Sequence, residues 1–147
     1  MPAFHDPIVH DRLRARLEAL TPDAPRQWGQ MSVDQMLWHV NESLRSALGQ
    51  AQHKPKKPPP IPRAMFRFIV LNLPWPKGAP THPECVAGRR YNFSEEKAQA
   101  LQLIDAFASR SIDGPWADSP VFGPVKGRFV SRLQAKHLDH HLRQFGA

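Results

Sequence analysis

The chain of 147 residues is long enough to bury a core, and we expect residues 1–147 to form one domain. Lys and Arg outnumber Asp and Glu by 20 to 13, but no recognition helix, Cys/His finger or aromatic–basic RNA platform accompanies this excess, so we expect no nucleic-acid partner. The sequence has a single Cys, no apolar run long enough to span a bilayer and no signal-peptide pattern at its start. We therefore expect a cytoplasmic protein with no membrane partner.

The first predicted helix covers residues 7–20. Asp6 suits the cap position, and Pro7 suits the first helical position, where the missing backbone N–H would have no partner in any case. Two Pro residues within 21–25 end this helix. Apolar residues at helical spacing would form its buried stripe: Ile8, Leu13, Leu17 and Leu20.

The second predicted helix covers residues 32–48. Ser32 and Gln35 form a capping-box pattern at its start, and Gly49 fits the position just after its end. His39 shares a face with the neighbouring apolar residues of this helix. We therefore expect its imidazole to point into the core.

A long crossover follows the second helix. Residues 50–62 contain five Pro, which exclude a helix or a central strand and predict an extended segment. The basic, Pro-rich residues 54–62 are either a docking or phosphate-binding arm or a stiff connection, and we favour the connection. The apolar residues 63–73 predict a short helix, which the Pro-rich residues 74–80 end.

Two further helices complete the predicted fold. One begins after an irregular segment that runs to Phe93, with Ser94 as its cap and the acidic residues Glu95 and Glu96 in its first turn. The other covers residues 128–145, which contain neither Pro nor Gly. Four long helices joined by a long crossover predict an all-α fold, a four-helix bundle.

The last helix contains two histidines, His137 and His141, that are four residues apart and therefore lie on one face. This spacing lets two imidazoles hold one metal ion, and His39 is the candidate third ligand. Three imidazoles leave coordination positions open, as in catalytic sites, whereas a fourth ligand such as Cys85 or His140 would favour a closed structural or sensing site. The alternative is that these histidines are ordinary hydrogen-bonded residues of the bundle.

Several motifs resemble those of the DinB-like (YfiT-type) bundle superfamily. Residues 137–141 look like the H-x-x-x-H run on the last helix of these proteins, and His39 stands where a histidine on the second helix completes their triad. Residues 28–39 resemble the W-x-x-M-x-x-x-Q-M-x-x-H opening of a branch of uncharacterised members. Residues 73–78 and 136–141 look like further signatures of that branch, so the resemblance extends over nearly the whole chain.

The resemblance implies an up-down-down-up bundle, often a homodimer, that holds a divalent metal ion through His39, His137 and His141. Imidazole donors suit zinc, nickel, iron or copper; we expect zinc or nickel, with iron or manganese as alternatives. Some relatives are thiol S-transferases that use a low-molecular-weight thiol such as bacillithiol or mycothiol. We expect a small-molecule substrate and a thiol S-transferase, with a metal-dependent hydrolase or a non-catalytic metal-binding bundle as alternatives. Whether the site is catalytic stays open at this point.

Two further residues are candidates for supporting roles. Glu42 is the nearest carboxylate to His39 in sequence, and it either orients a ligand or is an exposed helix charge, which we favour. Cys85 follows His82 with metal-ligand spacing. As a nucleophile, the Cys85 thiol would need a nearby base, so we expect an unreactive thiol.

Overall fold

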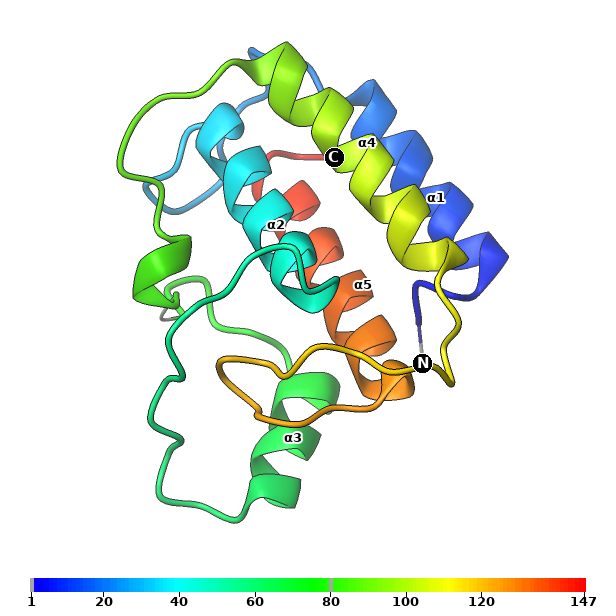
Figure 1. The fold of residues 1–147 in the computed structure, drawn as a ribbon. Helices are drawn as coiled ribbons and strands as arrows, with labels where there is room; N and C mark the ends of the chain where they lie inside the picture. The colour runs from blue at the N-terminus through cyan, green and yellow to red at the C-terminus, as the bar shows by residue number, and fades with distance from the viewer. Residues whose placement is uncertain (1, 80) are drawn as a thin grey trace.

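Four long helices form the fold: α1 (Pro7–Ala19), α2 (Val33–Ala47), α4 (Phe93–Ser109) and α5 (Gly127–Gln144). The structure, a computed structural model, describes residues 2–79 and 81–147. Both α1 and α2 pack against α4 and against α5. Following the chain in Figure 1, α1 and α5 run one way, whereas α2 and α4 run the other. The predicted all-α bundle with up-down-down-up topology is therefore confirmed, and the described residues contain no strand.

Two shorter elements lie in the long connection between α2 and α4. The helix α3 (Arg63–Asn72) packs against α5, and the 3₁₀ turn η1 (Pro83–Cys85) packs against α2. Residues 50–62 form neither helix nor strand, as predicted for the Pro-rich crossover. Within the described part of the chain, no helix has the length and apolar character needed to cross a membrane.

The helix ends follow local side-chain chemistry. At the start of α2, Oε1 of Gln35 accepts a hydrogen bond from the backbone N of Ser32 at 3.0 Å, as the capping-box pattern predicts. The predicted cap of α4, Ser94, is wrong. Asn92 occupies the cap position with an extended backbone, and its Oδ1 accepts a hydrogen bond from the backbone N of Glu95 at 3.0 Å. Asn and Ser are equally good residues at a helix N-cap. Because Asn92 precedes Ser94 by two residues, the helix begins at Phe93.

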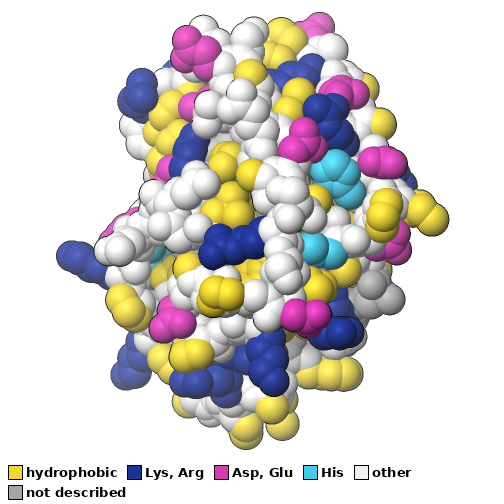
Figure 2. Space-filling view, turned by 45° about the vertical axis from the view of Figure 1, so that its right-hand side comes forward, with side chains coloured by type: hydrophobic (Ala, Val, Ile, Leu, Met, Phe, Trp, Pro, Cys, Tyr) yellow, Lys and Arg dark blue, Asp and Glu magenta, His cyan; other side chains and the backbone are white. Residues whose placement is uncertain are grey.

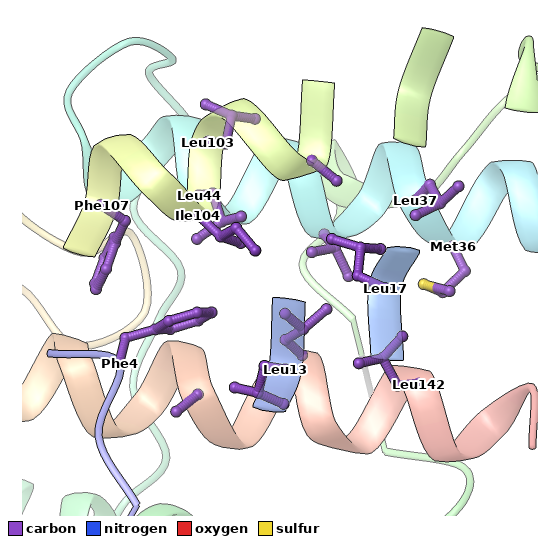
Figure 3. Packing of buried hydrophobic residues seen from close by; sticks show 14 of the residues in the cluster. Phe4, Leu13, Leu17, Met36, Leu37, Leu44, Leu103, Ile104, Phe107 and Leu142 are labelled. Carbon is purple, nitrogen blue, oxygen red and sulfur yellow. The ribbon is translucent and has the colours of Figure 1, made fainter. Parts of the chain in front are cut away.

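The core lies between the four long helices, and the N-terminal segment packs against its end (Figure 3). Phe4 is fully buried, and its ring centroid lies 5.4 Å from that of Phe107 on α4. The predicted stripe of α1 is wrong at Ile8, which is 78% exposed, and Val9 is buried instead. Because adjacent helical residues point about 100° apart, only one of these two side chains can face the core.

Gly127, the first residue of α5, lies where no side chain fits. A Cβ atom there would overlap the carbonyl oxygen of Ile112 and lie 2.5 Å from Nε1 of Trp116. Gly127→Ala is therefore expected to lower the free energy of unfolding by about 1–3 kcal/mol, because the backbone at Ile112 has to move. Urea unfolding followed by circular dichroism measures this loss.

Gly88→Ala is the matched control, since a Cβ atom at Gly88 would have no neighbour within 4 Å. It should change the free energy of unfolding by less than about 0.5 kcal/mol. Equal stability of the two variants would contradict the close packing of α5 against Ile112.

Candidate metal centre

The three histidines singled out in the sequence come together between two packed helices. His39 lies on α2, and His137 and His141 lie one turn apart on α5. Nε2 of His137 lies 2.9 Å from Nε2 of His39 and 3.1 Å from Nε2 of His141. One potential ligand atom from each residue lies within 4.8 Å of the other two, so this group could hold a metal ion.

The tautomer of His39 is fixed by a backbone carbonyl. Nδ1 of His39 lies 2.8 Å from the carbonyl oxygen of Cys85 in η1. A carbonyl oxygen only accepts, so Nδ1 carries the hydrogen and donates it. In the neutral ring the lone pair is then on Nε2, the atom that faces His137.

The tautomer of His141 is fixed by the side chain of Gln144. Nε2 of Gln144 donates to the carbonyl oxygen of Trp28 at 3.0 Å, which leaves Oε1 to accept from Nδ1 of His141 at 2.9 Å. Gly29, with φ of 86°, allows this close approach, because a Cβ atom there would overlap Nε2 of Gln144. The lone pair of His141 is therefore also on Nε2, directed at His137.

All three imidazoles are held in the neutral form that coordinates a metal ion. Burial lowers the pKa of His39, and burial together with the neighbouring histidines lowers the pKa of His137 well below the usual histidine range. Burial is also the main cause that lowers the pKa of His141 to about 3. Neutral histidines with oriented Nδ1–H groups are the form found around protein-bound metals.

The three Nε2 atoms fit the donor set of a divalent metal. Since His39 and His141 have bare Nε2 atoms, at most the one hydrogen of His137 can lie between the three nitrogens. Tetrahedral zinc with bonds of about 2.0–2.1 Å separates its ligand nitrogens by about 3.3 Å. The observed separations of 2.9 and 3.1 Å are slightly shorter, so small outward movements of the rings would bring them to that spacing. Nδ1 of His137 is buried and has no hydrogen-bond partner among the described residues.

Aromatic and basic side chains lie beside the triad. The ring centroid of Trp75 lies 6.0 Å from that of His137 and 5.4 Å from that of His140. The ring centroid of Trp28 lies 5.6 Å from that of His140. Nζ of Lys77 lies 5.2 Å from the Trp28 ring centroid, and this lysine is exposed. These residues border the metal-ligand group on the side of His140.

The other candidates from the sequence lie outside the group. Within the described residues neither Cys85 nor His140 joins the three histidines as a potential ligand. Burial, followed by the charges of Glu42 and Glu84, raises the pKa of the Cys85 thiol to about 11, so this thiol stays protonated at neutral pH. Glu42 forms an ion pair with Arg45 at 2.9 Å and lies 3.5 Å from Nε2 of His53.

Three groups in the hydrogen bonds behind the histidines were not predicted from the sequence. Gln144 follows His141 by three residues on the same helix, and that spacing was a usable signal. The carbonyl oxygens of Cys85 and Trp28 gave no signal, because every residue type has a carbonyl group.

Asp34, in the first turn of α2, fixes the segment that connects η1 to α4. Its buried carboxylate accepts hydrogen bonds from the guanidinium of Arg90 and from the backbone N of Tyr91 at 2.8 Å. Burial alone would raise the pKa of Asp34, but the hydrogen bonds from Arg90 and from the backbone N of Tyr91 outweigh burial and hold the pKa well below its usual range.

Asp34→Asn is expected to lower the free energy of unfolding by about 1–3 kcal/mol near neutral pH, because it removes charge-assisted hydrogen bonds. Since the folded-state pKa is depressed, this stabilisation is present above the unfolded-state pKa of about 3.9 and is lost as the pH falls through the folded-state pKa. Urea unfolding of the parent protein and of Asp34→Asn at decreasing pH should show the difference between their free energies of unfolding disappearing below about pH 4. A difference in stability that does not change with pH would mean that the ionised carboxylate of Asp34 does not cause it.

Comparison with known proteins identifies the family. The model of the DinB superfamily matches residues 8–145. No curated protein and no solved structure matches the chain significantly. The family match covers nearly the whole chain and agrees with the resemblance of residues 28–39 and 137–141 to DinB-like motifs. The chain therefore belongs to the DinB superfamily.

Proposed function

We propose that the protein binds one divalent metal ion, preferably zinc or nickel, through His39, His137 and His141. The convergence of their Nε2 atoms from two facing helices is the observation that supports this proposal. Two of the three rings are oriented by acceptors at Nδ1, which is the usual arrangement behind metal-bound histidines. Membership of a superfamily of metal-binding bundles agrees with it.

We further propose that the site is that of a thiol S-transferase, which joins a low-molecular-weight thiol to a small electrophile. An ion with three protein ligands supplies a position at which a bound thiol or water loses its proton near neutral pH. In the transfer, sulfur forms a bond to an electrophilic carbon, and the leaving group departs with the electrons of the broken bond. The one Cys of the chain is buried with a raised pKa, so the reacting sulfur has to enter with a substrate.

The residues beside the triad suit a small polar substrate. Trp28, Trp75 and His140 offer aromatic surface next to His137, which would shield a bound molecule from water. Lys77 offers an exposed ammonium group to an anionic group of a substrate.

The test is conjugation of a chloronitroaromatic electrophile to a series of thiols, with protein stripped by a chelator and reloaded with zinc or nickel. We expect product formation that requires both metal and thiol and that is absent in His39→Ala. Metal-dependent cleavage of esters by water alone would assign the site to a hydrolase. Full metal occupancy without turnover of any thiol or ester would assign a non-catalytic metal-binding bundle.

Gln144 provides a separate test of the metal site. Gln144→Met keeps the length of the side chain but removes the acceptor for Nδ1 of His141, so metal affinity should fall by about 10–100-fold. The measurement is a zinc titration against a competing chelator. Gln102→Met, an exposed position on α4, is the matched control and should bind as tightly as the parent protein. Unchanged affinity in Gln144→Met would show that this hydrogen bond does not orient a ligand.

A further inference from the structure

The net charge of the protein is concentrated in one part of the chain. Residues 43–83 contain seven of the 20 Lys and Arg residues and none of the 13 Asp and Glu residues, so the rest of the chain has 13 of each sign. The net charge of +7 therefore belongs to the end of α2, the Pro-rich crossover, α3 and the residues up to η1. Such an asymmetry indicates an anionic partner for this part of the surface.

The same part of the chain exposes an apolar helix face. Met65 and Phe68 lie three residues apart on one face of α3 and are 52% and 62% exposed, and Leu73, just after the helix, is 48% exposed. Ile69, four residues after Met65 on the same face of α3, is 37% exposed, and Ile61, in the crossover before the helix, is 39% exposed. We call these five residues the α3 stripe. All five side chains keep a substantial exposed fraction in the described part of the chain.

The opposite face of α3 is packed, so the stripe does not result from a loosely attached helix. Leu71 is buried, and the ring of Phe66 stacks on that of Phe122 with centroids 5.1 Å apart. Lys136 of α5 donates to the carbonyl oxygens of Val70 and Leu73. The helix is thus fixed to the bundle by one face and presents the other to solvent.

Exposed cations flank the α3 stripe. Lys54, Lys56 and Lys57 precede it in the crossover, Arg63 lies in the first turn of α3, and Lys77 follows it; all five are exposed. In Figure 2, Lys and Arg side chains gather with hydrophobic side chains at the lower end of the molecule, where Figure 1 places α3. This end therefore combines an apolar helix face with several exposed basic side chains.

We propose that the α3 stripe and its flanking lysines dock the protein onto an anionic lipid surface. An amphipathic helix with a basic border lies in the headgroup layer, its apolar residues below the phosphates and its cations beside them. A nucleic acid would leave Met65 and Phe68 exposed to water, and a second copy of this chain would bring two like-charged segments together. The sequence-based expectation of no membrane partner considered only a spanning segment, which peripheral contact does not need.

The experiment is sedimentation with vesicles of phosphatidylcholine, with or without phosphatidylserine, at low and high salt. We expect the protein to bind only the phosphatidylserine vesicles and to dissociate at high salt. Met65→Ser/Phe68→Ser and Lys54→Gln/Lys56→Gln/Lys57→Gln should each weaken binding by roughly tenfold or more. Ile8→Ser and Arg12→Gln, at exposed positions of α1, are the matched apolar and charge controls and should bind like the parent.

Three results would overturn the proposal. One is no binding to phosphatidylserine vesicles at low salt. The second is binding that the lysine variant loses but Met65→Ser/Phe68→Ser retains, which would indicate general attraction to polyanions. The third is a change of oligomeric state in Met65→Ser/Phe68→Ser by sedimentation velocity without lipid, which would assign the stripe to a second copy of the chain.

Discussion

Replacing His137 with Ala is expected to weaken metal binding by roughly a hundredfold or more, while the helical content stays nearly unchanged. Structural zinc sites bind with on the order of 10 kcal/mol, so the loss of one of three donors removes about 3 kcal/mol. His137 is the residue whose Nε2 lies within 3.1 Å of the Nε2 atoms of both other histidines. Zinc titration against a chelator, on protein purified without an affinity tag, measures the effect.

His10→Ala is the matched control for His137→Ala. His10 lies on α1, where its Nε2 is 3.0 Å from a carboxylate oxygen of Asp105, away from the triad. The control should keep the metal affinity of the parent. Equal affinities in both variants, with folding verified by circular dichroism, would reject the three-histidine site and leave the histidines as hydrogen-bonded residues of the bundle.

Phe4→Ala is expected to lower the free energy of unfolding by about 3–5 kcal/mol, although Phe4 precedes the first helix. Its side chain is fully buried against Phe107, and its backbone N donates to the carbonyl oxygen of Ser131 at 3.2 Å. His5 continues this attachment, since its backbone N donates to Oγ of Ser131 at 3.1 Å. Truncation therefore leaves a cavity at the end of the bundle that the surrounding helices cannot fill. Urea unfolding gives the free energy.

Ile8→Ala serves as the control for Phe4→Ala, because the Ile8 side chain is 78% exposed. It should change stability by no more than about 0.5 kcal/mol. If the two variants were equally stable, the N-terminal segment would not be part of the core.

The helices were predictable where local signals are strong. Asp6 with Pro7, Ser32 with Gln35, and Gly49 mark helix ends by hydrogen bonding and backbone conformation, which depend only on nearby residues. Prediction was wrong where two neighbouring residues compete for one role, as Asn92 and Ser94 do for the cap of α4. The choice between them depends on the direction from which the chain enters the helix, which is set by tertiary packing.

The convergence of the three histidines was predictable for a different reason. His137 and His141 are related by the geometry of one helix, and the apolar surroundings of His39 indicate that it points inward. The burial of Phe4 had no comparable signal, because the residues around it follow no helical or strand period. Long-range contacts of an irregular segment depend on the assembled fold.

The hydrogen bonds behind the three histidines differ in how strongly they restrict which residue can stand at each position in related proteins. Cys85 and Trp28 contribute only carbonyl oxygens to this network, so a homologue can change either side chain and retain both bonds. Position 144 needs a side chain that accepts from Nδ1 of His141, and position 29 needs Gly beside it. A search pattern for this kind of site should therefore require residues 29 and 144 together with the three histidines, and leave positions 28 and 85 free.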